Sequence, residues 1–317
     1  MKIVLIEPLG ITKSSLESIV AKCDLLDHEL VIYDHKPVNQ TDLIERASQA
    51  EIMVTVNEPI SAEVIEKCHS LKMISIAFTG YDHVDLAACK ASHVTATNAA
   101  GYATNSVAEL TIGLIIDLLR NVVIADHKTR IGETRVGIIG NQLKGKNIGI
   151  IGAGAIGTKV AELAVAFGCK VFYYSRTKKT KLTKIGAKYL PLTKLLKISD
   201  IITIHVPLTM ETKNLIRTKE LALMKPTAFL IQTSRGGVVN EADLTEALNK
   251  NVIAGAGIDV FETEPPLNLD QPLLMAKNTL LTPHVAFATK EALEARAKIA
   301  FTNIKNWLAD KPKNIVG

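Results

Sequence analysis

The sequence predicts an α/β protein with two doubly wound parallel sheets, and three observations lead to that fold class. Short apolar segments alternate with helical ones along most of the 317 residues. A glycine-rich turn follows one apolar segment at 147–157. A long helical stretch, roughly 105–127, separates two series of apolar segments. Such alternation is typical of parallel sheets covered by helices on both faces.

The first series of predicted strands is short and apolar. It comprises KIVLIE (2–7), ELVIYD (29–34), EIMVTV (51–56), KMISIAF (72–78) and HVTAT (93–97). Between these strands lie segments with the residue spacing of helices, as at 12–23, 41–49 and 61–68. We therefore expect residues 1–101 to form the first part of a flavodoxin-like domain.

The second series begins at the glycine-rich turn and predicts a Rossmann-type domain over 102–286. Its strands are expected at 147–151, 170–174, 200–206, 227–233, 253–259 and 278–282. The segment 288–310 has helical spacing and is too long to be only the last crossover. We expect residues 287–317 to return to the first domain, so that the Rossmann domain is inserted into it. A helix appended to the second domain is the alternative.

Composition excludes several classes of protein. The chain is 47% hydrophobic and 22% charged, which is ordinary for a globular protein. Its net charge of +5 and its 4% aromatic content do not favour nucleic-acid binding. The four cysteines stand alone, so we expect reduced thiols and no metal site. The apolar run 110–119 contains Asp117 and is too short to span a bilayer. We expect a cytoplasmic protein without a membrane partner.

The turn Gly152-Ala-Gly154-Ala155-Ile156-Gly157 follows a predicted strand and opens a helix. Gly152 suits a tight turn, Gly154 leaves room for a pyrophosphate, and Gly157 allows close packing of helix and strand. The N–H groups of the first helical turn, at Ala155 and Ile156, would face the anion. The pattern predicts a dinucleotide site; a glycine turn that only packs is the alternative.

The loop after the next strand bears on the choice of dinucleotide. An NAD site usually has an acidic residue there that binds the ribose. This chain has Ser175, Arg176 and Thr177, followed by Lys178 and Lys179, and no carboxylate. A guanidinium can bind a 2′-phosphate with two parallel hydrogen bonds, so the loop favours NADP over NAD. A solvated basic loop, with Arg176 lying over the adenine, remains the alternative.

Three further motifs follow predicted strands. TSRGG (233–237) contains Arg235, GIDVFETEPP (257–266) contains Asp259 and Glu264, and LTPHVAFAT (281–289) contains His284. Ligands bind at the carboxyl ends of strands in such sheets. Each residue alone has a structural explanation, as an ion-pair residue, a loop carboxylate or a helix cap. Together they suggest a base, its orienting acid and an anion anchor.

With these motifs, the chain resembles the D-specific 2-hydroxyacid dehydrogenases. This family includes phosphoglycerate, glycerate and D-lactate dehydrogenases and glyoxylate/hydroxypyruvate reductases. The resemblance covers nearly the whole chain. It rests on FTGYDHVD (78–85), NAAGYATNSVAEL (98–110), LKGKNIGIIGAGAIG (143–157), HVPLTMET (205–212), TSRGGVVNEADL (233–244), GIDVFETEPP and LTPHVAFAT. The sequence departs from the family at Ala100, where a proline is usual, and in the missing acid after the second Rossmann strand.

The resemblance implies roles for particular residues. Arg235, Glu264 and His284 match the catalytic arginine, glutamate and histidine. The backbone amides of Thr79 and Gly80 match those that bind the substrate carboxylate, and Tyr102 matches a tyrosine that contacts substrate in some members. The resemblance also implies that the cofactor is bound by five further residues, His205, Pro207, Thr212, Thr233 and Asp259. Of these, Asp259 is expected near the nicotinamide amide.

The expected function is therefore reversible transfer of a hydride between NAD(P)H and a small 2-oxo acid. Substrates of the glyoxylate/hydroxypyruvate or phosphoglycerate type are expected. A D-lactate dehydrogenase type, or a nucleotide-sensing binding protein with an idle site, is the alternative. His284 would donate the proton, Glu264 would orient its ring, and Arg235 would hold the carboxylate. The apolar stretch within 105–140 exceeds the needs of one helix face, so a homodimer is expected there.

Overall fold

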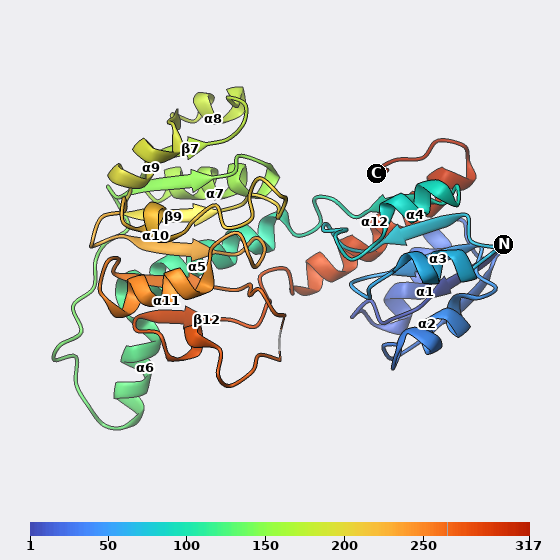
Figure 1. Cartoon of the computed structure of the whole chain (residues 1–317), viewed down its shortest axis with the longest axis horizontal. Helices are drawn as coiled ribbons and strands as arrows, with labels where there is room; N and C mark the ends of the chain where they lie inside the picture. Colours follow the sequence, from blue (N-terminus) through green and yellow to red (C-terminus); the bar gives the residue numbers. More distant parts are fainter. Residues whose placement is uncertain (265) are drawn as a thin grey trace. The chain divides into compact units, whose positions relative to one another are not determined.

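The computed structural model describes residues 1–264 and 266–317, which divide into two compact units. Unit 1 comprises Met1–Ala103 and Ala288–Gly317, and unit 2 comprises Thr104–Phe287 (Figure 1). Each unit is built on a sheet whose paired strands are all parallel. The predicted fold class, with two parallel-sheet α/β domains, is confirmed.

Unit 1 contains a five-stranded sheet in the order β2-β1-β3-β4-β5. Its elements in this part of the chain are β1 (Lys2–Leu5), α1 (Lys13–Lys22), β2 (Glu29–Ile32), α2 (Gln40–Ala47), β3 (Ile52–Thr55), α3 (Ala62–Lys67), β4 (Met73–Ile76), α4 (Leu86–Ala91) and β5 (Thr95–Asn98). The helices begin where side chains accept hydrogen bonds from the first turn: Thr12, Asn39, Ser61 and Asp85. Short polar residues at these positions therefore set the helix starts.

The helix α12 (Lys290–Leu308) completes unit 1 after the chain has passed through unit 2. It packs on α1, β4 and β5. Phe301 and Ile304 are fully buried, and Ser75 in β4 donates a hydrogen bond to the carbonyl oxygen of Ala300 at 2.9 Å. Asn303 donates to the carbonyl oxygen of Asn98 at 2.9 Å. Apolar burial and these side-chain bonds both hold α12 in this unit.

Unit 2 contains a seven-stranded sheet in the order β12-β11-β10-β9-β6-β7-β8. Its elements are α5 (Thr104–Arg120), α6 (Val122–Arg130), β6 (Asn147–Ile151), α7 (Ala155–Ala166), β7 (Lys170–Tyr174), α8 (Thr180–Lys184), β8 (Lys188–Tyr189), α9 (Leu192–Ile198), β9 (Ile201–Ile204), α10 (Thr218–Leu221), β10 (Phe229–Gln232), α11 (Glu241–Asn249), β11 (Gly255–Ile258), the 3₁₀ turn η1 (Pro272–Met275) and β12 (Thr279–Leu281).

Two apolar clusters of buried side chains cover the two faces of this sheet. One contains side chains of α5 and α7, and the other contains side chains of α9, α10 and α11. Successive strand residues alternate between them, so Ile150 lies in the first cluster and Ile151 in the second. Strands buried on both faces explain the continuous apolar runs in the sequence.

Two local features differ from the sequence expectation. The expected helical stretch 105–127 is two helices, because Asn121 adopts a left-handed conformation with φ of 55° between α5 and α6. Asparagine tolerates this conformation better than most residues, so it can end a helix where no glycine or proline marks the end. The edge strand β8 was not predicted, since its two residues, Lys188 and Tyr189, carry no periodic signal.

In the described part of the chain, no helix has the length and apolar character needed to cross a membrane. No group of three or more histidine, cysteine or carboxylate side chains in those residues could hold a metal ion. The cysteines are free, and burial raises the pKa of Cys68, Cys89 and Cys169 to about 11. These three side chains are thiols at neutral pH, which makes them weak nucleophiles.

Candidate active site

The site residues expected in unit 2 follow the carboxyl ends of its parallel strands. The glycine turn follows β6, which lies between β7 and β9 in the sheet. The strand order reverses at this point, which is where ligands bind in doubly wound sheets. Because all the paired strands are parallel, the segments after β9, β10, β11 and β12 emerge at the same edge as the glycine turn.

The glycine turn has the shape that a dinucleotide requires. Gly152 has φ of +101°, and a Cβ there would lie 2.6 Å from the carbonyl oxygen of His205. A Cβ on Gly157 would lie 2.0 Å from the carbonyl oxygen of Gly152. At Gly154, by contrast, a Cβ would meet no atom within 4 Å. The outer glycines are therefore required by the chain itself, and the middle one leaves open space where a pyrophosphate can approach the backbone.

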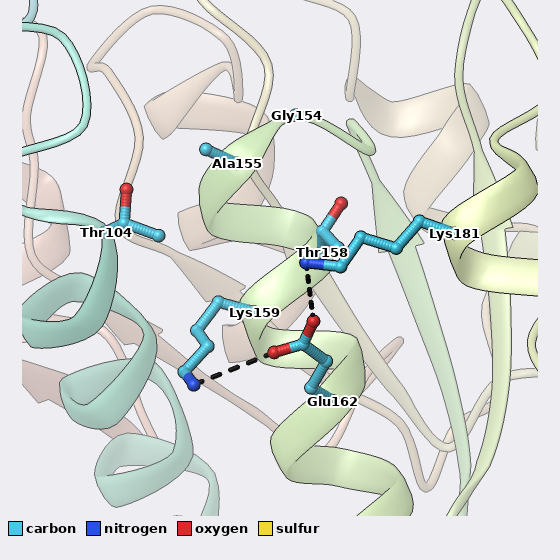
Figure 2. Close-up of a pocket in the computed structure, with 7 residues that line it drawn as sticks. All are labelled: Thr104, Gly154, Ala155, Thr158, Lys159, Glu162 and Lys181. Carbon is cyan, nitrogen blue, oxygen red and sulfur yellow. Dashed lines mark ion pairs between the residues drawn. The ribbon is translucent and has the colours of Figure 1, made fainter. Parts of the chain in front are cut away.

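That open space continues into a cavity of about 380 Å³ beside the first turns of α7 (Figure 2). Its lining residues are Thr104, Gly154, Ala155, Thr158, Lys159, Glu162 and Lys181. The neighbouring Ile156 instead packs against the apolar cluster of α5 and α7. The backbone shape and the cavity together fit a dinucleotide bound across the N-terminus of α7.

The loop after β7 lies exposed beyond this helix. Ser175 donates a hydrogen bond to the carbonyl oxygen of Thr177 at 2.6 Å, which tightens the turn. Arg176 and Thr177 are exposed, as are Lys178 and Lys179. The loop thus presents a guanidinium to solvent and has no carboxylate of its own.

The loop after β9 contains a half-buried histidine, His205. The Nε2 atom of His205 lies 2.9 Å from the hydroxyl of Thr203, while the buried Nδ1 atom has no hydrogen-bond partner in the described structure. Burial lowers the pKa of His205 to about 3, so the ring is neutral at physiological pH. Further along, the hydroxyl of Thr212 donates to the carbonyl oxygen of Pro207 at 2.5 Å. Thr212 therefore closes this loop internally.

The end of β10 holds the arginine of the TSRGG motif. Thr233 is buried, and its hydroxyl lies 3.0 Å from that of Thr111 on α5. The amide of Gln232 donates to the carbonyl oxygen of Arg235 at 2.6 Å, and the Arg235 guanidinium donates to the carbonyl oxygen of Ser234 at 2.9 Å. A buried glutamine, which no sequence motif indicated, thus contacts the backbone of Arg235.

Asp259, at the end of β11, anchors the loop that carries the histidine. Its carboxylate is fully buried and accepts from the hydroxyl of Thr282 at 2.6 Å and from the backbone amides of Val285 at 2.9 Å and Ala286 at 3.0 Å. Burial raises the pKa of Asp259, and these hydrogen bonds oppose that effect. The family resemblance implied that Asp259 lies near the nicotinamide, but no feature of the sequence indicated this contact with the loop 282–286.

The loop brings His284 and Glu264 together. The Nδ1 atom of His284 lies 2.6 Å from Oε2 of Glu264, with 16% and 46% of the two side chains exposed. The ring of Phe287 meets the imidazole edge-on, with centroids 5.5 Å apart. His284 has φ of 54°, an uncommon conformation for a non-glycine residue, and such outliers cluster at functional sites.

The remaining candidates, Thr79, Gly80 and Tyr102, belong to unit 1. The carbonyl oxygen of Thr79 accepts from the side chain of Asn98 at 2.7 Å, which links the segment after β4 to the end of β5. Tyr102 is buried, and its ring centroid lies 5.9 Å from that of Phe78. The two segments are thus held together within unit 1.

A glycine turn at the reversal point of a parallel sheet, with a histidine–carboxylate pair at the same edge, defines a dinucleotide-dependent oxidoreductase. Residues 112–286 match the family described as D-isomer specific 2-hydroxyacid dehydrogenase, NAD binding domain. The chain belongs to this family, as its motifs predicted. It is a D-2-hydroxyacid dehydrogenase or 2-oxoacid reductase that uses NAD(P).

Individual relatives agree with this membership. The chain is 42% identical over 272 residues to a glyoxylate reductase of Thermococcus litoralis, covering 83% of this chain and 82% of the relative. It is 34% identical over 300 residues to a hydroxypyruvate reductase of Blautia hydrogenotrophica, covering 91% and 92%. A solved structure, an acyclic imino acid reductase in complex with NADPH and D-Arg, matches with a TM-score of 0.90 and 31% identity over all of both chains.

Proposed function

We propose that this enzyme reduces glyoxylate or hydroxypyruvate, with unit 1 as the substrate domain and unit 2 as the cofactor domain. The observation that carries the proposal is the 2.6 Å contact between His284 and Glu264 at the carboxyl edge of the unit 2 sheet. An imidazole held by a carboxylate is suited to donate a proton to the oxygen of a 2-oxo acid. Relatives named glyoxylate reductase and hydroxypyruvate reductase support this choice of substrate.

The chain's own residues divide the chemistry among them. His284, as imidazolium, donates its proton to the keto oxygen, and in the reverse direction the neutral ring accepts it. Glu264 fixes the orientation of the ring through its contact with Nδ1. Arg235 binds the substrate carboxylate through two donors and stabilises charge on the neighbouring oxygen. The bound nicotinamide supplies the hydride.

Other residues bind and position. We assign binding of the substrate carboxylate to the backbone amides of Thr79 and Gly80, and a contact with the rest of the substrate to Tyr102. We assign the dinucleotide to residues at the strand ends of unit 2: Gly152, Gly154, Ala155, Ile156, Gly157, Ser175, Arg176, Thr177, His205, Pro207, Thr212, Thr233 and Asp259. The hydrogen bonds from Thr282, Val285 and Ala286 support an added role for Asp259 in holding His284 in place.

We further propose that the enzyme prefers NADP to NAD. The exposed Arg176 and the absence of a carboxylate from residues 175–180 support this preference. A 2′-phosphate would be attracted by the guanidinium and would meet no repelling acid in that loop. If Arg176 lies over the adenine instead, both cofactors would be used equally.

Consumption of reduced cofactor, followed by its absorbance, tests the function. The panel is glyoxylate, hydroxypyruvate, pyruvate and phosphohydroxypyruvate, each with NADPH and with NADH. Glyoxylate and hydroxypyruvate are expected to give the highest kcat/KM. Pyruvate as the best substrate would indicate a D-lactate dehydrogenase type, and phosphohydroxypyruvate a phosphoglycerate type. If none of the four is reduced, the proposed substrates are wrong and a nucleotide-sensing role gains support.

We also propose that the enzyme is a cytoplasmic homodimer that associates through α6 and the segment after it. No side chain of α6 is buried, and Figure 1 shows α6 at the margin of unit 2, away from the sheet. Exposed apolar side chains continue beyond the helix to Val136 and Ile139, which are 77% and 87% exposed. Exposed apolar side chains that cluster along one segment favour association. A monomeric mass by light scattering at micromolar concentration would contradict the proposal.

A further inference from the structure

We propose that Lys181 binds a phosphate group of the dinucleotide, and that it leaves Glu162 in order to do so. The proposal rests on the use of NAD(P) by the enzyme and is independent of the preference between the two cofactors. It assigns Lys181, on α8, as a phosphate ligand, and Glu162, on α7, as the counter-charge that Lys181 exchanges for phosphate.

The glycine turn supplies no charge of its own. The helix α7 begins with Ala155, Ile156, Gly157 and Thr158, and its cap residue is Gly154. These residues offer backbone N–H groups and the positive end of the helix dipole, which together are equivalent to about half a charge. A dinucleotide diphosphate carries more negative charge than that, so a cation nearby would strengthen binding considerably.

The cavity beside Gly154 contains three charged side chains, Lys159, Glu162 and Lys181. Figure 2 shows both lysines reaching the one carboxylate. The Nζ atom of Lys181 lies 2.8 Å from Oε1 of Glu162, and that of Lys159 lies 3.6 Å from Oε2. The hydrogen bond from Lys181 is the main cause that lowers the pKa of Glu162, so the carboxylate is ionised at neutral pH.

The two lysines contact different oxygens of Glu162, which makes it easier for Lys181 to exchange this carboxylate for a phosphate. When Lys181 moves to a phosphate, Glu162 keeps its pairing with Lys159 and is not left as an isolated charge. The Lys181 side chain is 72% exposed, so little packing opposes its movement. An exposed ion pair is weak, whereas a phosphate group offers more charge and several strong acceptor oxygens. The free energy therefore favours the phosphate over Glu162 as partner of Lys181.

Calorimetric binding of two probes to the full chain tests the assignment. The probes are 2′,5′-ADP, which carries the 2′-phosphate, and ADP, which carries the diphosphate. Lys181→Met is expected to weaken one or both about tenfold, which corresponds to ~1.4 kcal/mol. Lys181→Arg should restore most of the affinity because it keeps the charge. If Lys181→Met loses affinity for 2′,5′-ADP alone, the 2′-phosphate is the partner of Lys181. If it loses affinity for ADP, the diphosphate is the partner.

Lys184→Met is the matched control, because Lys184 lies on the same helix, is exposed and carries the same charge. It should change the affinity for either probe by less than about twofold. Equal losses in the Lys181 and Lys184 variants would show a general charge effect and overturn the assignment. Wild-type affinity in Lys181→Met for both probes would also overturn it.

Glu162→Gln tests the exchange itself. Removing the competing carboxylate should tighten binding of the affected probe about two- to fivefold, since an exposed pair of this kind is worth ~1 kcal/mol or less. The same change made in Lys181→Met should have no such effect. Unchanged or weaker binding in Glu162→Gln would refute the exchange. If the wild type prefers NADH but Lys181→Met loses affinity for NADH, the NADP preference fails while the assignment of Lys181 stands.

Discussion

The backbone N–H of His284 donates a hydrogen bond to the carbonyl oxygen of Asp259 at 2.8 Å. His284, which follows β12, is therefore also tied to the residue directly after β11. The carboxylate of Asp259 adds bonds to Thr282, Val285 and Ala286, on both sides of the histidine. A buried acid thus holds the left-handed conformation of His284 in place.

Asp259→Asn should lower kcat by about tenfold, because one side of the carboxamide presents a donor to the N–H groups that the carboxylate accepted. The loop 282–286 would then hold the imidazole less firmly. Measuring both kcat and the dissociation constant of the reduced cofactor distinguishes positioning of His284 from direct contact with the cofactor. If cofactor binding alone weakens and kcat stays normal, Asp259 contacts the cofactor and does not position His284.

His284→Ala should lower kcat by about 10²- to 10⁴-fold through the loss of the proton donor, with cofactor binding retained. His93→Ala is the matched control, since His93 also has a left-handed conformation but lies exposed in unit 1. It should leave turnover unchanged. Near-normal turnover in His284→Ala would remove this residue from the acid–base role.

Glu264→Gln keeps a hydrogen-bond acceptor beside His284 but removes the negative charge. A carboxamide makes a weaker hydrogen bond to the imidazole than a carboxylate does, so the ring should be held less firmly and kcat for reduction should fall about tenfold. The measurement is kcat and KM for the 2-oxo acid, compared with Glu262→Gln as a neighbouring exposed carboxylate. Unchanged kcat in Glu264→Gln would separate Glu264 from His284.

Arg176→Ala should reduce kcat/KM for NADPH by about tenfold or more and leave that for NADH nearly unchanged, since a charge-assisted phosphate contact contributes ~1.5–3 kcal/mol. Ser175→Asp should shift the preference to NADH, because a carboxylate accepts from the ribose hydroxyls and repels the phosphate. A wild type that strongly prefers NADH, and is insensitive to Arg176→Ala, would favour stacking of Arg176 on the adenine.

His205 should make the protein less stable in acid. Its folded-state pKa of about 3 lies below the ordinary value of 6.5, because burial disfavours the charged ring. The unfolded chain therefore binds this proton first, and the resulting loss of stability begins as pH falls below about 6.5 and continues toward about 3. Tm measured over this range should fall less steeply in His205→Gln than in the wild type. His69→Gln is the control, because His69 is exposed. Identical slopes of Tm against pH in the wild type, His205→Gln and His69→Gln would contradict the burial of His205 as the cause.

Much of the fold could be predicted from local patterns. Continuous apolar runs identified the strands β1 to β7 and β9 to β12, and the strands of 201–204 and 229–232 lie inside the longer segments expected at 200–206 and 227–233. The boundaries were less accurate, because flanking residues such as Ala228 are buried by tertiary packing without joining the strand. The break at Asn121 escaped prediction because its backbone conformation has no periodic signature.

The sequence by itself determined the fold class, the glycine turn and the family, and it supplied the candidate site residues, since each depends on residue type and spacing along the chain. The tertiary structure alone decided which of those residues touch. The bonds of Asp259 to the loop of His284, and the two lysines on Glu162, join segments that different elements bring together. The roles assigned to these residues remain predictions. Hydrogen bonds and ion pairs form only when two atoms come within a few ångströms of each other. The spacing of residues within one segment does not give the distance from that segment to another.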